Sequence, residues 1–168
     1  VKDCEQIDSR IITLTIKAKI PIKIINIYAP TATDTEKEKE KFWERVAEAT
    51  RTQGKKEIKV ILGDWNTSFR NRRSGEEEIL GTNILPDKTD QTDEKESNRE
   101  KAIDLCNNIN LRIMNTAERR TRKHTVTYRT INTSDKGKRK WDETQHRQID
   151  FIAITKEHSK LMTNIKAD

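Results

Sequence analysis

The stretch "KVILGDWNTSF", Lys59 to Phe69, is the part of the sequence from which the fold is best inferred. The segment "EIKVIL" at 57–62 predicts a short β-strand. Its continuously apolar end predicts a central strand buried on both faces. Gly63 lets the backbone turn closely where this strand ends. Asp64 and Asn66 follow two residues apart, the spacing that places strand side chains on one face.

Asp64 and Asn66 allow two interpretations. A carboxylate at a strand end can orient or deprotonate a water, and a neighbouring amide can donate to a phosphate oxygen, as phosphodiester hydrolysis requires. The same residues also suit an Asx turn that closes a strand. The motif alone favours the turn, so the other motifs of the chain have to decide between the two.

Alternating apolar and β-branched residues predict further strands on both sides of this stretch. The first two, over 10–17 and 22–29, form a hairpin around Pro21. Three more are predicted over the ranges 111–115, 125–130 and 148–155. The last two of these are expected to pair as a hairpin with basic residues on its arms.

Capping signals predict two helices. The first is expected to begin at a capping box, Thr33 with Glu36 or Thr35 with Glu38, and to end at Gly54.

The second helix is expected to begin at another capping box, Ser97 with Glu100. Residues 68–96 show no hydrophobic period and predict a long loop. The 168 residues contain no internal repeat and fit one domain. Strands joined by helical crossovers predict the α/β fold class.

The positive charge of the chain is concentrated in one segment. The net charge is +6, and charged residues (37%) outnumber hydrophobic ones (32%). Residues Arg119 to Arg147 contain ten Lys or Arg and three Asp or Glu, a net of +7, so the remainder sums to −1. A localised basic segment indicates a polyanionic partner.

Other functional classes find little support in the sequence. The two cysteines, Cys4 and Cys106, give neither a disulfide framework nor a metal-ligand spacing. The apolar runs are much shorter than the roughly 20 residues of a membrane span, and no signal peptide is evident.

Two other stretches point to chemistry. "NIYAPT" ends a strand with Tyr28 beside a loop broken by proline. "QIDFI" places Asp150 within an apolar strand, where an unpaired carboxylate would be costly. The partner of Asp150 could be a histidine, or a backbone group or threonine hydroxyl.

Five motifs occur in a recognisable order: "NIYAPT", "GDWN", "NT" at Asn115 and Thr116, "TVTY" and "QIDFI". In this order they resemble the endonuclease/exonuclease/phosphatase family, the superfamily of deoxyribonuclease I and the apurinic/apyrimidinic endonucleases. The closest resemblance is to the endonuclease domains of non-LTR retrotransposons, and it covers almost the whole chain. It implies a partial four-layer α/β sandwich of the deoxyribonuclease I-like type.

The resemblance also implies a role for each matching residue. Tyr28 would contact the scissile phosphate. Asp64 would position or deprotonate the attacking water, and Asn66 would hold the phosphate. Thr127 would support the site by hydrogen bonding, and Asp150 would orient a catalytic histidine. A Mg²⁺ ion would neutralise charge that develops on the phosphate oxygens.

The sequence departs from the family at both ends. The family's opening strands, with an asparagine and a metal-binding glutamate, and its terminal Ser-Asp-His motif are not matched in residues 1–168. The resemblance therefore implies a single partial domain, inactive as given, whose metal ligands are unknown. We expect it to belong to a longer retrotransposon polyprotein or a degenerate copy of one, intracellular and nuclear if functional. His124, His146 and His158 are predicted to be surface or loop residues.

The expected partner is DNA, with no role for a membrane. The related endonucleases place a DNA-contacting hairpin beside the site, where this chain is basic. The residues predicted to bind nucleic acid are Arg119, Arg120, Arg122, Lys123, Lys136, Lys138, Arg139 and Lys140. Two alternatives remain: a non-catalytic nucleic-acid-binding remnant, and a phosphatase or phosphodiesterase acting on a phosphoinositide or sphingolipid head group. The concentrated charge favours nucleic acid over a small head group.

Overall fold

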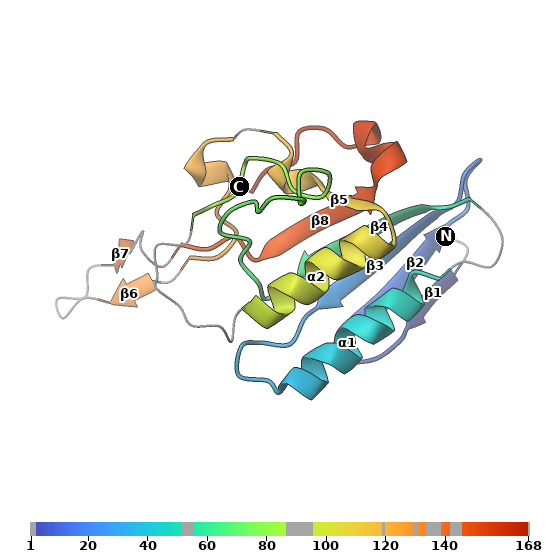
Figure 1. Cartoon of the computed structure of the whole chain (residues 1–168), viewed down its shortest axis with the longest axis horizontal. Helices are drawn as coiled ribbons and strands as arrows, with labels where there is room; N and C mark the ends of the chain where they lie inside the picture. Colours follow the sequence, from blue (N-terminus) through green and yellow to red (C-terminus); the bar gives the residue numbers. More distant parts are fainter. Residues whose placement is uncertain are drawn as a thin grey trace.

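The computed structural model describes residues 3–51, 56–86, 96–118, 120–129, 131–133, 139–141 and 146–167. Its main element is a mixed six-stranded sheet in the order β1-β2-β3-β4-β8-β5, which two helices cover on one face (Figure 1). The sheet strands are β1 (Asp3–Gln6), β2 (Ile11–Ile16), β3 (Ile22–Tyr28), β4 (Ile58–Asp64), β5 (Leu111–Ile113) and β8 (Asp150–Thr155). The helices are α1 (Glu36–Ala49) and α2 (Glu96–Asn108). The predicted α/β class is therefore confirmed.

Smaller elements lie outside this layer pair. Strands β6 (Ile131–Thr133) and β7 (Arg139–Trp141) form a separate antiparallel pair that projects from the body, at the left in Figure 1. The described part of the chain also contains three short 3-10 helices: η2 (Met114–Thr116), η3 (Arg122–His124) and η5 (Lys156–Leu161).

The strand predicted from the central apolar run, β4, occupies the position predicted for it. β4 lies between β3, with which it pairs in parallel, and β8, with which it pairs antiparallel. Helix α1 makes the crossover that a parallel pair requires. The hairpin predicted from Pro21 is present as the antiparallel pair of β2 with β3.

Helix α1 begins at one of the two capping boxes in the sequence. The Thr35 hydroxyl accepts from Glu38 N, and the Glu38 carboxylate accepts from Thr35 N at 2.8 Å. Phe42 and Val46 on one side of the helix are fully buried against the sheet. The helix ends at Ala49, earlier than the Gly54 expected from the sequence.

Helix α2 corrects the second capping prediction. It begins at Glu96, so Ser97 lies inside the helix and is not its N-cap. Ala102 and Cys106 are fully buried and turn the apolar side of α2 toward the sheet.

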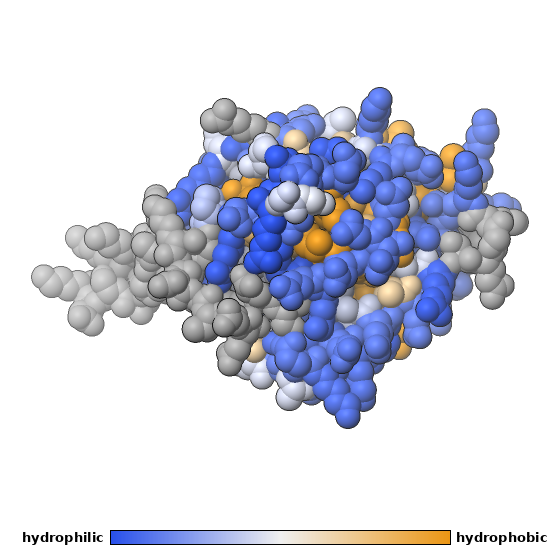
Figure 2. All heavy atoms as spheres, in the orientation of Figure 1, coloured by the Kyte–Doolittle hydropathy of each residue, from blue (hydrophilic) through white to orange (hydrophobic). Residues whose placement is uncertain are grey.

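We call the sheet face under α1 and α2 the helix face; Ile25, Ile61 and Phe151 are buried there. Its core is aromatic, with the ring of Trp65 at 5.8 Å from Trp43 and 5.9 Å from Phe151, both edge-on. Trp65, between Asp64 and Asn66, is fully buried. The helix layer itself presents a mostly hydrophilic surface, with apolar residues visible mainly near its centre (Figure 2).

We call the opposite side of the sheet the far face. Val60 and Ile154 are buried there, and Met114 and Met162 pack over them from the later part of the chain. Over β2 the same face is less covered, and Ile12 is 42% exposed. The described residues thus form one helix layer and one sheet layer of the four-layer arrangement expected from the resemblance.

One strand prediction was wrong and another was too long. In the range 125–130, the described residues 125–129 are irregular, and their only ladder contact with the described part of the chain is an isolated bridge between Tyr128 and Arg147. β8 does not pair with these residues but lies between β4 and β5. The predicted strand 111–115 continues only to Ile113 because the chain then turns into η2.

The loop over 68–86 carries more of the core than its polar composition suggested. Ile79 and Leu80 are fully buried. Arg99 of α2 reaches into this loop and places two nitrogens at 2.7 Å from the two carboxylate oxygens of Glu76. This buried ion pair fixes the loop against α2.

Candidate active site

Neighbouring strands bring Tyr28, Asp64 and Asp150 into a row at one end of the sheet. Tyr28 is the register partner of Asp64 in the β3–β4 pair, and Asp64 is the register partner of Asp150 in the β4–β8 pair. In an antiparallel ladder such as β4–β8, directly opposed residues have Cβ atoms about 4.5–5.5 Å apart. Tyr28 is 49% exposed, so one end of the row is open to solvent. The sequence predicted all three as site residues, and the structure brings them together.

Asp64 is electrostatically the most perturbed member of the row. Partial burial raises the pKa of Asp64 above its ordinary value, and the nearby Asp150 carboxylate raises it further. A hydrogen bond of 2.8 Å, donated by Asn66 N to Asp64 Oδ1, opposes both effects and lowers it. A carboxylate with a raised pKa beside a second carboxylate is typical of acid–base sites.

Asn66 links the Asp64 turn to the loop after β3. It adopts a left-handed conformation with φ of 44°, and its side-chain Nδ2 donates to Ala29 O at 2.7 Å. The bond from Asn66 N to Asp64 Oδ1 is an Asx turn. The Asx-turn interpretation is therefore confirmed, and the catalytic interpretation stays a prediction, since the β3–β4 and β4–β8 registers are what place Asp64 in the row.

Asp150 is held through its backbone from two sides. Thr127 Oγ1 accepts from Ile149 N at 3.0 Å and from Asp150 N at 3.1 Å. Asn115 donates to Asp150 O at 2.9 Å and accepts from Ile152 N at 3.2 Å. Thr127 thus supports the site by hydrogen bonding, as the resemblance implied, and Asn115 is a support to which the sequence analysis gave no role.

Asp150 differs from the expectation in one respect. It is the first residue of β8 and is half-buried, so it does not lie within a fully buried strand.

A cavity of about 280 Å³ opens beside Asp150 on the far face. Asn115, Thr127 and Asp150 line it together with His124 and the chain segment 165–167. His124 was expected to be a surface or loop residue, whereas it is half-buried on η3 and its Nδ1 lies 2.9 Å from Ala167 O. No local motif in the sequence singles out His124, because only the fold brings it to the cavity that Asp150 also lines.

The other two histidines lie elsewhere. His158 lies in η5, and its Nδ1 is 3.1 Å from Oγ1 of Thr155, the last residue of β8. His146 is half-buried, in the connection that leads into β8.

The basic residues predicted to bind nucleic acid are only partly described. Arg122 and Lys123 are exposed on η3, next to the cavity. Arg120 is half-buried and paired with Glu118, so its charge is partly neutralised. The backbones of Arg139 and Lys140 lie on β7 in the projecting hairpin. Arg119, Lys136 and Lys138 lie outside the described residues.

The site offers few protein ligands for a metal ion. Within the described ranges, no group of three or more His, Cys, Asp or Glu side chains could hold one. Asp64 and Asp150 are adjacent carboxylates, and Mg²⁺ is commonly held by one or two carboxylates while substrate phosphates and waters complete its shell. The described residues therefore offer two carboxylates to a divalent ion, and Mg²⁺ binding stays a prediction.

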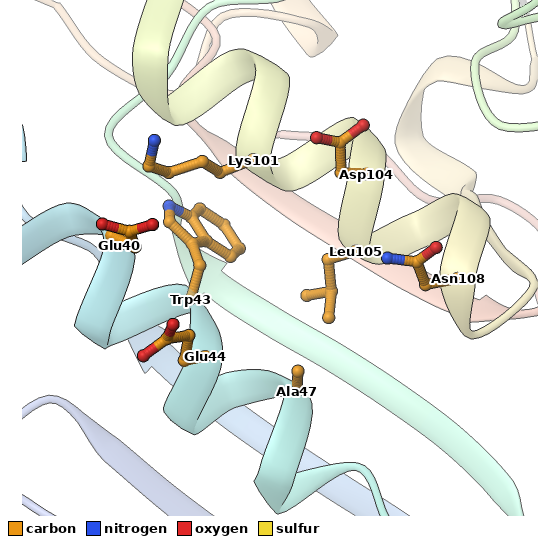
Figure 3. Close-up of a pocket in the computed structure, with 8 residues that line it drawn as sticks. All are labelled: Glu40, Trp43, Glu44, Ala47, Lys101, Asp104, Leu105 and Asn108. Carbon is orange, nitrogen blue, oxygen red and sulfur yellow. The ribbon is translucent and has the colours of Figure 1, made fainter.

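A second hollow lies on the other side of the molecule, between α1 and α2 (Figure 3). Its volume is about 340 Å³, and its floor is formed by Trp43 and Leu105. Glu40, Glu44 and Asp104 surround it, and no residue of the row takes part. Its composition gives no hydrolytic arrangement, so the row on the sheet remains the candidate active site.

Comparisons with known proteins give limited information. No family model matches the sequence, and no curated protein matches it. One solved structure that is similar in fold is an endonuclease/exonuclease/phosphatase family protein from Leptotrichia buccalis C-1013-b. The TM-score is 0.46 and the identity 14%, and the match covers 86% of this chain and 42% of that one. This chain therefore spans less than half the length of that protein. Among the described residues, no helix has the length and apolarity needed to cross a membrane.

Proposed function

We propose that this chain is a retrotransposon-type DNA endonuclease domain that hydrolyses phosphodiester bonds with Mg²⁺. The observation that supports this most is the row of Tyr28, Asp64 and Asp150 on three neighbouring strands, with a perturbed carboxylate at its centre. The motif order in the sequence supports the same function.

In the proposed reaction, a water held by the Asp64 carboxylate attacks phosphorus, and Asp64 accepts its proton. The raised pKa of Asp64 suits this role because a more basic carboxylate takes a proton more readily. The bond from phosphorus to the leaving oxygen breaks, and that oxygen receives a proton from solvent. The phenol of Tyr28 is exposed next to Asp64 and can donate to a phosphate oxygen.

Asp64 and Asp150 would hold Mg²⁺ together with the substrate phosphate. The ion would supply positive charge to the phosphate oxygens, and it would reduce the repulsion between the two carboxylates. We expect millimolar Mg²⁺ to raise the melting temperature of the chain in the presence of a short DNA duplex, with a smaller rise for Asp150→Asn. An equal rise in both proteins would count against this metal site.

DNA is proposed as the substrate because positively charged residues are concentrated in a segment outside the row of Tyr28, Asp64 and Asp150. The net +7 of Arg119–Arg147 exceeds what a single phosphorylated head group requires. Arg122 and Lys123 are exposed and directly precede His124, which lines the Asp150 cavity, where the backbone of a bound strand would pass. Phosphate contacts of this kind position a duplex without reading its sequence.

Nicking of supercoiled plasmid in Mg²⁺ tests the proposal. The family's glutamate and Ser-Asp-His motifs are not matched in residues 1–168, so the assay is run on these residues alone and within any longer chain that encodes them. We expect Asp64→Ala or Asp150→Ala to lower the nicking rate of the active form by roughly 10²-fold or more. Asp104→Ala, an exposed carboxylate on α2, is the matched control and should leave the rate unchanged.

Nicking that survives Asp64→Ala would contradict the proposed site. Hydrolysis of small phosphate monoesters without nicking of DNA would instead favour a phosphatase. DNA binding without any nicking, in either form of the chain, would favour the non-catalytic alternative.

A further inference from the structure

A fourth side chain, Arg10, extends the row beyond Tyr28. It directly precedes β2, whose register pairs Ile11 with Ile27, so Arg10 lies beside Tyr28. Tyr28 N donates to Arg10 O at 2.9 Å, which fixes this alignment. Since the side chain of Ile11 is buried on the helix face, alternation places Arg10 on the same face as the exposed Tyr28.

The guanidinium of Arg10 stacks on the ring of Tyr28. Its central carbon is 5.2 Å from the ring centroid, within the range of a cation–π contact. The side chain keeps 31% of its surface exposed. A positive charge therefore lies at the open end of the row, next to the phenol proposed to touch the scissile phosphate.

The contacts of Arg10 in the described structure are long. Nη1 lies 3.5 Å from Tyr28 O and 3.4 Å from Ala29 O, and Nη2 lies 3.8 Å from Asp34 Oδ1. A guanidinium has five N–H donors and binds an oxyanion best through two of them. These long contacts orient Arg10 but do not use all five of its N–H donors.

Arg99 shows what a structural arginine looks like in the same protein. It is 3% exposed, and two of its nitrogens lie 2.7 Å from the oxygens of Glu76. It also donates to Asn71 O at 3.1 Å. Arg10 is more exposed, and among the described residues no carboxylate forms a comparable fork with its guanidinium.

Nearby acidic groups are engaged with other partners. Asp34 accepts from Thr31 N at 2.6 Å and from the Thr31 hydroxyl at 2.8 Å. Asp8 Oδ2 pairs with Arg45 at 2.8 Å. Arg10 therefore remains available to an added anion.

We propose that Arg10 binds a phosphate of the DNA strand that flanks the scissile phosphate. This proposal rests on the function proposed above and names a contact for its substrate. Two strand spacings of about 4.8 Å separate Arg10 from Asp64 across the sheet, so the bound phosphate is a neighbour of the one that Asp64 attacks. The substrate strand then runs along the row, from Arg10 across Tyr28 and Asp64 toward Asp150.

The test is a salt titration of binding to a fluorescent duplex in EDTA, so that no cleavage occurs. Removing one phosphate contact should reduce the slope of log K against log salt by about 0.9. We expect this change for Arg10→Gln and for Arg10→Met, two substitutions that remove the charge in different ways, and a retained slope for Arg10→Lys. Lys37→Gln is the matched control, because it removes one exposed positive charge from α1 and should leave the slope unchanged.

Each result decides a different point. A slope in both neutral Arg10 variants equal to that of the unsubstituted chain, with binding weakened or not, would show that Arg10 only positions Tyr28 and would overturn this proposal alone. A slope change of the same size in Lys37→Gln would show a general charge effect and overturn it as well. If the unsubstituted chain does not bind duplex DNA, the proposed function fails and this proposal fails with it.

Discussion

Replacing Gly63 by alanine should destabilise the protein severely, because this residue lies where β4 meets β3 and just before Asp64. Its φ is +128°, a conformation that residues with a side chain rarely adopt, and an added Cβ would lie 2.0 Å from Ile27 O. Cβ atoms essentially never approach another heavy atom closer than 3.0 Å. The two central strands would have to separate, or Gly63 would have to change conformation and shift Asp64.

The expected cost of Gly63→Ala combines two effects. Overpacking a well-packed position costs about 1–3 kcal/mol, and holding a residue in a disfavoured backbone region costs about 1–3 kcal/mol. The free energy of unfolding should therefore fall by about 2–6 kcal/mol, a large part of the roughly 5–15 kcal/mol typical of a domain. At an m-value of about 2 kcal/mol per M, the urea midpoint would fall by about 1–3 M.

Gly75→Ala is the matched control for this measurement. Gly75 also has a positive φ, +88°, but an added Cβ would meet nothing within 4 Å. Only the backbone term applies, so the loss should be about 1–2 kcal/mol. Equal urea midpoints for the two variants would refute the idea that close packing of β3 on β4 positions Asp64.

Three further predictions concern charge, buried hydrogen bonds and a thiol. Burial and Asp150 raise the folded-state pKa of Asp64, so the folded state becomes less stable as the pH rises through the titration of this carboxyl group. Asp64→Asn should therefore raise the melting temperature at pH 7 while removing nicking. A lowered melting temperature would contradict this. Asn98→Ala leaves Trp43 Nε1 and Pro30 O without their hydrogen bonds of 3.0 and 2.7 Å, so the free energy of unfolding in urea should fall by about 1–3 kcal/mol. A fall below about 0.5 kcal/mol, the size typical of surface substitutions, would contradict this. Burial raises the pKa of Cys106 to about 12, so a thiol reagent should modify only the exposed Cys4 in the folded protein, and equal labelling rates for both cysteines would contradict the fold.

Much of the local structure could be predicted from the sequence because it depends on local signals. The apolar run before Gly63 indicated the central strand, and the Thr35–Glu38 capping box indicated the start of α1. The range 125–130 was misassigned because its β-branched residues suit a strand, whereas the described residues 125–129 form only one isolated bridge, between Tyr128 and Arg147. β1, an exposed edge strand, was not predicted, since it carries no apolar alternation.

The candidate site could be predicted residue by residue, but its geometry could not. Asp64 and Asp150 are 86 positions apart in the chain and become neighbours only through the β4–β8 register. The same holds for Arg10, which no sequence motif singles out and which gains its place from the pairing of β2 with β3. Register depends on packing across the whole sheet, and single-sequence patterns do not specify it.

The most direct test of the proposed site is an NMR titration of the folded chain with a short DNA duplex in the absence of Mg²⁺. This measurement reports binding at each backbone amide and does not require turnover. The largest chemical-shift changes are expected at Tyr28, Asp64 and Asp150, with little change at Glu44 and Asp104 on the opposite side of the molecule. Changes confined to the α1–α2 side, or no changes along the row at saturating DNA, would contradict the claim that this row binds the substrate phosphodiester.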